Sequence, residues 1–161
     1  MKAVSLHQPW ASAIAIGAKH FETRSWPIRY RGPIAICAAK TPLHARSEER
    51  SRPALWANVF RTMSVAPGWL TGSLPFGAVV AVAEVVECYR VADLGFSKLS
   101  ALELALGDFS GIRYGWLLEN IVALPQPVPC RGFQSIFELP GDVAAAVQQQ
   151  VAAASGKESG Q

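Results

Sequence analysis

The sequence has no long hydrophobic run and few cysteines. No apolar run in its 161 residues approaches the ~20 residues that a membrane-spanning helix needs. At the N-terminus, His7 and Gln8 interrupt the chain before the apolar core of a signal peptide could form. The three cysteines, Cys37, Cys88 and Cys130, are odd in number and far apart, which favours buried, reduced thiols over disulfides. We therefore expect a cytoplasmic protein without a membrane partner.

The sequence also lacks the patterns of metal sites, repeats and disordered chains. Its three histidines, His7, His20 and His44, have no C-x-x-C or H-x-x-x-H spacing. We therefore expect no metal site, and nothing in the sequence indicates a cofactor. Hydrophobic residues make up 50% of the chain and charged residues 17%, and Pro and Gly break the apolar runs at short intervals. This composition is typical of one globular domain.

Positive charge is concentrated in one part of the chain. The net charge of the whole chain is only +3, but residues 19–52 carry eight cations against three carboxylates, a local balance of 8 − 3 = +5. The cations are Lys19, Arg24, Arg29, Arg31, Lys40, Arg46, Arg50 and Arg52, and the carboxylates are Glu22, Glu48 and Glu49. Such a stripe attracts polyanions, although it could also be a solvated basic loop beside a helix.

Proline, glycine and capping residues predict where helices begin and end. Pro9 suits the first turn of a helix over about residues 9–16, and Gly17 suits its left-handed end. Ser100 and Glu103 have the spacing of a capping box, which predicts a short helix that stops at Gly107. The other predicted helices are two pieces within residues 41–63, divided by Pro53, and a last helix over 141–154 with Val143, Val147 and Val151 on one face, before a disordered tail over 155–161.

Alternating and β-branched runs predict about five strands in mixed order with these helices. The predicted strands cover residues 20–26, 32–39, 76–91, 112–124 and 132–140. The link "PQPVPC", residues 125–130, is not expected to pair inside a sheet, because proline cannot donate to a ladder. We therefore predict an α+β fold with a small β-barrel at its centre.

The strand predicted over residues 20–26 concentrates ionic side chains. Alternation places Glu22, Arg24 and Trp26 on one face, and Lys19 lies in the preceding turn. The carboxylate at position 22 can hold the guanidinium at position 24 in a fixed pose. Cations for phosphate, a ring for stacking and a carboxylate that accepts from an exocyclic amine suit a nucleotide pocket.

Two other interpretations of this strand stay open. Glu22 and Arg24 could be an ordinary surface ion pair, and Trp26 could be part of the core. A lysine close to a glutamate could also relay protons in an enzyme site. Arg29 and Arg31 in the following loop favour a binding site, because they add guanidiniums beside the cluster.

Four residues of this region form a motif that resembles a known family. Gly17, Lys19, Glu22 and Arg24 match the G-x-K-x-x-E-x-R pattern of the ASCH domain family, whose fold is similar to the PUA domains of RNA-modifying proteins. The "QPW" helix before the motif is typical of the subgroup found in activating signal cointegrators. Downstream, "FGAVVAVAEVVEC" and "YGWLLENIVALPQPVPCRGFQSIFEL" resemble later strands of the family, so the resemblance covers about residues 3–139.

The resemblance implies a PUA-like β-barrel of about five to six strands with helices packed around it. The single ASCH domain would cover residues 1–140. A cleft lined by Lys19, Glu22 and Arg24 would bind RNA, single-stranded DNA or a nucleotide. The complete predicted nucleic-acid-binding set is Lys19, Glu22, Arg24, Trp26, Arg29 and Arg31, of which the last three come from the charge and aromatic argument.

Another branch of the family hydrolyses N4-acetylcytidine with a lysine, a threonine and a distant glutamate. Lys19 matches the lysine, but Glu22 stands where these hydrolases have the threonine, and Thr23 is expected on the opposite strand face. Hydrolysis with Glu22 as base and Lys19 polarising a carbonyl is chemically consistent, and so is metal-independent cleavage of RNA. Three hypotheses therefore stay open: a nucleic-acid-binding module, which we favour, a hydrolase, and a partner-binding domain of a larger assembly.

Overall fold

The computed structural model describes residues 1–40, 59 and 74–158. The strands are β1 (Lys2–Leu6), β2 (Phe21–Arg24), β3 (Gly32–Ala38), β4 (Ala78–Arg90), β5 (Tyr114–Pro129) and β6 (Ile136–Glu138). The α-helices in the described ranges are α1 (Trp10–Ala15), α3 (Ala101–Leu106) and α4 (Gly141–Glu158), and short 3-10 turns occupy Val91–Asp93 and Phe96–Lys98. The helical pieces predicted within residues 41–63 lie outside the described residues, apart from Val59.

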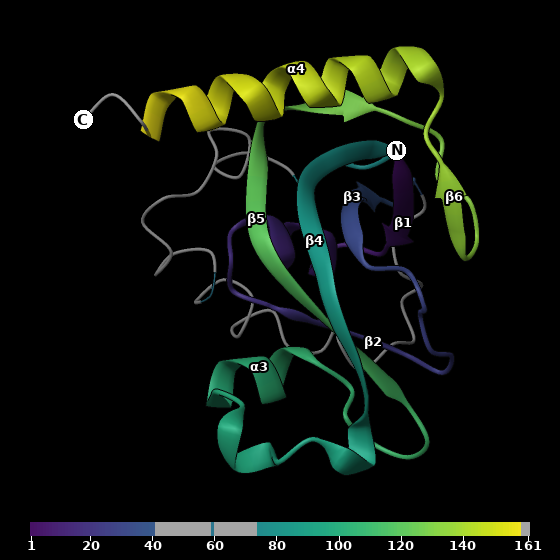
Figure 1. The fold of residues 1–161 in the computed structure, drawn as a ribbon, viewed down its shortest axis with the longest axis vertical. Coiled ribbons are helices and arrows are strands. Elements are labelled where there is room, and N and C mark those ends of the chain that lie inside the picture. Colours follow the sequence, from purple (N-terminus) through teal and green to yellow (C-terminus); the bar gives the residue numbers. More distant parts are fainter. Residues whose placement is uncertain (41–58, 60–73, 159–161) are drawn as a thin grey trace.

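The strands form one six-stranded sheet in the order β2-β5-β4-β3-β1-β6. Only β1 and β3 pair in parallel, and the other neighbours are antiparallel. The sheet curls into a half-barrel, with α4 across one end and α3 at the opposite end (Figure 1). The predicted α+β class with a barrel-like centre is therefore confirmed.

Apolar side chains on both faces of the sheet form the core. Ile14 of α1 is fully buried and packs with Ile34, Ile36 and Trp116 from the sheet. On α4, Val147 is fully buried in a second cluster, and Val143 and Val151 pack against it, as the four-residue spacing predicts. No helix in the described ranges is long and apolar enough to cross a membrane.

The proline-rich link lies within a strand, which makes one prediction wrong. The strand β5 continues through this link as far as Pro129 and stays paired with β4. The register shifts between Val79 and Ala81 of β4, so that residues 124–127 of β5 lie opposite a single β4 residue. Pro125 and Pro127 fall in this bulge, where a ladder N–H is not required, and the sheet therefore tolerates them.

The sequence patterns do not predict β1, although it lies inside the sheet between β3 and β6. Other boundaries differ from the predicted ones. The strand β2 ends at Arg24, because a bend at Ser25 and Trp26 leads into Pro27. The strand β6 is limited to Ile136–Glu138, and α4 extends to Glu158, past the predicted end at residue 154.

Candidate functional site

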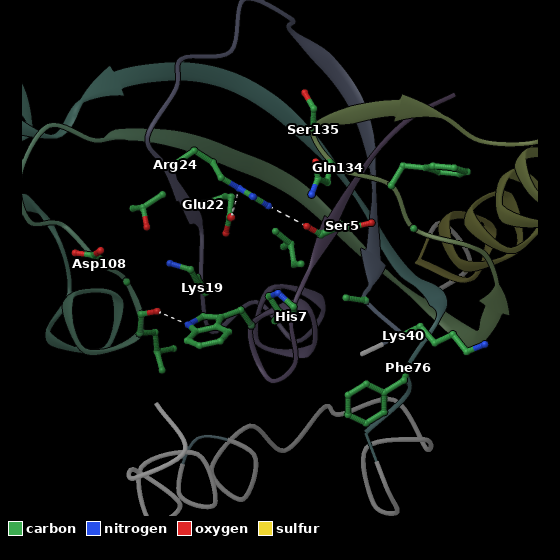
Figure 2. A pocket seen from close by; sticks show the side chains of 18 of the residues that line it. Ser5, His7, Lys19, Glu22, Arg24, Lys40, Phe76, Asp108, Gln134 and Ser135 are labelled. Carbon is green, nitrogen blue, oxygen red and sulfur yellow. Dashed lines mark hydrogen bonds and ion pairs between the residues drawn. The ribbon is translucent and has the colours of Figure 1, made fainter. Parts of the chain in front are cut away.

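A cavity of about 1950 Å³ lies beside β2. Its walls come from the motif strand and the turn before it, the end of β1, the segment after α3, and the segment between β5 and β6. Figure 2 shows Lys19, Glu22 and Arg24 on one side of this cavity, with Ser5 and His7 from the first strand and the loop after it. The sequence motif therefore faces a concave surface.

The lining of the cavity is rich in cations. The cationic side chains are Lys19, Arg24, Lys40, Arg113 and Arg131, and the carboxylates are Glu22 and Asp108. Their balance is 5 − 2 = +3 among the described lining residues. Trp10, Trp26, Phe76 and Phe133 add aromatic rings to the same lining. A surface with this charge attracts anions, and its rings offer flat apolar faces.

Lys19 is held at the cavity wall by Glu103 rather than standing free. Gly17 ends α1 with a left-handed φ of 71°, and Lys19, two residues later, is almost completely buried. Its Nζ donates to Glu103 Oε1 at 3.2 Å and lies 5.8 Å from the ring centroid of Phe109. The buried ammonium is therefore fixed in position beside the cavity.

Glu103 is a site residue that the sequence interpretation missed. The capping-box spacing assigned its side chain to the helix N-terminus, and the Glu103 N–H does donate to Ser100 Oγ at 3.0 Å. The carboxylate, however, accepts from the backbone N–H groups of His20 and Phe21 at 2.7 and 3.1 Å. It therefore fastens the start of β2 while it pairs with Lys19. No local pattern in the sequence indicates this contact, which joins residues 84 positions apart.

Glu22 and Arg24 contact each other, as their spacing predicts. Arg24 Nε lies 2.8 Å from Glu22 Oε1, and Arg24 Nη2 donates to the carbonyl of Ser5 at 2.9 Å (Figure 2). Glu22 is 8% exposed. Burial raises the pKa of its carboxyl above the ordinary value, although the cations of Arg24, Lys19 and Arg113 act in the opposite direction. The cavity thus contains a carboxyl whose proton affinity is increased.

The structure brings only some of the predicted nucleic-acid-binding residues to the cavity. Trp26 lines the cavity but is half-buried, and its ring makes an edge-to-face contact with Trp116 at 4.7 Å. Arg29 is exposed, and neither it nor Arg31 is among the lining residues. Arg31 forms an ion pair with Glu87 and donates to the carbonyl of Ile28, so its guanidinium is engaged elsewhere.

Several lining residues come from segments that the motif does not identify. Arg113 Nη2 donates to the carbonyl of Thr23 at 3.0 Å, and its Nη1 lies 3.4 Å from Asp108 Oδ2. Thr23 is itself 9% exposed and also lines the cavity. Beyond β5, the cavity wall is formed by Arg131, Gly132, Phe133, Gln134 and Ser135. Only the folding of the sheet places these distant segments together.

The cysteines are free thiols. Cys37 and Cys130 are buried, whereas Cys88 is half-buried, so the expectation of burial fails at that position. Burial, with the neighbouring Cys130, raises the pKa of the Cys37 thiol to about 12. This thiol is therefore protonated at neutral pH and a poor nucleophile. In the described ranges, no three His, Cys, Asp or Glu side chains are grouped to hold a metal ion.

The curled sheet, its flanking helices and the ionic cavity beside β2 define an α+β domain of the PUA-like barrel class. The ASCH domain profile matches residues 4–122, which is more than half of the chain. The chain therefore belongs to the ASCH domain family.

Solved structures of ASCH proteins have the same fold. A tyrosine-to-phenylalanine variant of ZmASCH from Zymomonas mobilis superposes with a TM-score of 0.53 at 18% identity, over 92% of this chain and 96% of that chain. ASCH from Zymomonas mobilis gives a TM-score of 0.52 at 16% identity, over 92% and 93% of the two chains. At these identities the likeness concerns the fold alone. Comparison with curated proteins gives no match.

Proposed function

We propose that the cavity binds nucleic acid, either RNA or single-stranded DNA, through its phosphates and a base or nucleotide. The observation that supports this proposal is that five cations, two carboxylates and several aromatic rings line one cavity of about 1950 Å³. This volume exceeds the roughly 300–1,000 Å³ of sites that hold one small molecule. A segment of a polyanion therefore fits the cavity better than an isolated metabolite.

The contacts of the motif residues support distinct roles in binding. Arg24 is fixed by Glu22 and Ser5 but keeps a side-chain exposure of 28%, so its guanidinium can still meet a phosphate. Glu22, once ionised, can accept from an exocyclic amine of a base. Lys19 lines the cavity from a buried position, where the Glu103 carboxylate balances its charge. The proposed location is the cytoplasm, since free thiols are typical of a reducing compartment.

Substitution of Arg24 tests this proposal. Arg24→Gln should weaken binding of a fluorescently labelled single-stranded RNA or DNA, measured by anisotropy over a series of salt concentrations. The logarithm of the affinity should fall linearly with the logarithm of salt, and losing one phosphate contact should reduce that slope by about 0.7. The matched control is Arg29→Gln, because Arg29 is an exposed cation outside the cavity lining.

The result of the Arg24 experiment can contradict the proposal in three ways. Wild-type protein that binds neither oligonucleotide would contradict it. So would binding that does not depend on salt, since phosphate contacts release counterions. Equal affinities of Arg24→Gln and Arg29→Gln would place the contacts outside this cavity.

A second candidate function is hydrolysis of an amide on a modified nucleoside such as N4-acetylcytidine. The observation that favours it is the buried Glu22 carboxyl, whose raised pKa makes its carboxylate a stronger base than an ordinary glutamate, with Lys19 in the same cavity lining. Glu22 would take a proton from water as the water oxygen attacks the amide carbonyl, and Lys19 would stabilise the oxyanion. Glu22 would then return the proton to the departing amine, which gives acetate and cytidine.

Chromatography of an incubation with N4-acetylcytidine tests the hydrolase. Wild-type protein should release cytidine, and Glu22→Gln should abolish the release because the amide cannot accept a proton. Unmodified RNA with a metal chelator, incubated in parallel, tests metal-independent cleavage through the same two side chains. Absence of both products at high protein concentration would exclude the two enzymatic hypotheses, and the two binding hypotheses, nucleic acid or a protein partner, would remain.

A further inference from the structure

Residues 131–135, between β5 and β6, form a wall of the cavity that the motif does not include. Every residue of this segment lines the cavity: Arg131, Gly132, Phe133, Gln134 and Ser135. Figure 2 shows Gln134 and Ser135 above Ser5, across the cavity from Lys19. The segment is therefore placed to contact the same ligand as the motif strand.

The segment carries an exposed aromatic platform. Phe133 is 48% exposed, which is high for a large apolar side chain that lines a cavity. The Arg131 guanidinium lies 5.3 Å from the Phe133 ring centroid, and Phe137 makes an edge-to-face contact with that ring, also at 5.3 Å. A ring and a guanidinium plane are the two kinds of surface on which unstacked bases pack.

The backbone of the segment is held in a fixed position. A Cβ at Gly132 would lie 2.3 Å from Ser5 Oγ and 3.2 Å from Ser5 Cβ, so a larger residue would have to displace the Ser5 side chain or move the segment away from β1. Ser135 has a left-handed φ of 62°, a conformation that is costly for a residue with a side chain. Such strain is concentrated at functional sites. The backbone carbonyl of Ser5 also accepts a hydrogen bond from Arg24, so the segment and the motif strand both contact this residue.

We infer that residues 131–135 recognise an unstacked base of a single-stranded nucleic acid. Phe133, with the Arg131 guanidinium, supplies the stacking surface, and the exposed Gln134 amide supplies a donor and an acceptor for a base edge. The inference rests on the proposed nucleic-acid binding and adds to it which segment of the cavity wall contacts the base, namely residues 131–135. A duplex does not suit this site, because its bases are stacked inside.

Abasic oligonucleotides separate base contacts from phosphate contacts. Labelled single-stranded RNA and DNA are each compared with a counterpart of equal length in which every nucleotide is abasic. Phe133→Ala should weaken binding of the intact strand about 5-fold or more, the usual effect of losing one stacked base, and leave binding of the abasic strand unchanged. Phe133→Trp should restore binding. Gln134→Ala should also weaken binding of the intact strand and leave binding of the abasic strand unchanged.

Phe96→Ala is the matched control. Phe96 has the same 48% exposure as Phe133 and also one edge-to-face partner, Phe109, but it does not line the cavity. Equal affinities of the Phe133→Ala and Phe96→Ala proteins for the intact strand would overturn the inference and leave the proposed function standing. Wild-type protein that binds abasic and intact strands equally would also overturn the inference, and of the proposed function it would leave only the phosphate contacts. Wild-type protein that binds neither would overturn the proposed function, and the inference with it.

Discussion

Glu22 is a carboxyl buried among cations, and its titration links the stability of the fold to pH. Burial raises its pKa in the folded state, although Arg24, Lys19 and Arg113 oppose that change. The folded chain therefore binds a proton at this position more readily than the unfolded chain. The stabilising contribution is complete below the unfolded-state pKa and is lost as the pH rises through the higher folded-state value.

Comparison with Glu22→Gln should reveal this titration. The neutral amide does not titrate, so the stability of wild-type protein relative to the variant should decrease as the pH rises from the ordinary glutamate pKa of 4.5 through the higher folded-state value. Each unit by which the pKa is raised corresponds to about 1.4 kcal/mol. Urea denaturation at several pH values measures the difference. Glu87, Asp108 and Glu138, whose pKa values are lowered, titrate equally in both proteins and cancel. Parallel stability profiles for the two proteins would mean that Glu22 is not perturbed.

At the scale of elements, local signals predicted those elements whose ends or buried faces are determined by particular residues. Gly17 adopts the left-handed conformation that ends α1, and the Ser100 hydroxyl caps α3. Val147 marks the buried face of α4. The strand β1 has no such signal, because five residues without clear alternation are stabilised mainly by pairing with β3 and β6. The path of β5 through its prolines depends in the same way on a bulge against β4.

In the candidate site, too, contacts within one strand were predictable from the sequence and contacts between elements were not. Spacing along one strand predicted the contact between Glu22 and Arg24, because neighbours on one strand face are fixed by local geometry. The partner of Lys19 was not predictable from spacing, since Glu103 reaches β2 from another element. Arg29 and Arg31 were included for their charge alone, and charge does not determine the direction of a side chain. The segment 131–135 is brought to the cavity wall by contacts between distant elements, such as the pairing of β6 with β1.

At the scale of the whole molecule, the cavity depends on contacts between distant parts of the chain. Its lining begins at Ser5 and ends at Ser135, and the contact between Lys19 and Glu103 joins α3 to the start of β2. Both side chains of this pair are almost fully buried, with exposures of 2% and 6%. Removing one partner of a buried pair leaves the other charge uncompensated, which is costly even where the intact pair contributes little.

Lys19→Met should therefore destabilise the entire domain by about 3 kcal/mol, measured as the free energy of unfolding in urea. Lys40→Met is the matched control, because Lys40 lines the same cavity but is exposed, and its substitution should change the free energy by less than about 0.5 kcal/mol. Combining Lys19→Met with Glu103→Gln should cost less than the sum of the single substitutions, since the uncompensated carboxylate is then removed. Additive costs, or equal stabilities of the two lysine variants, would show that the buried pair does not hold β2 against α3, and that Lys19 is available to a ligand at no cost to the fold.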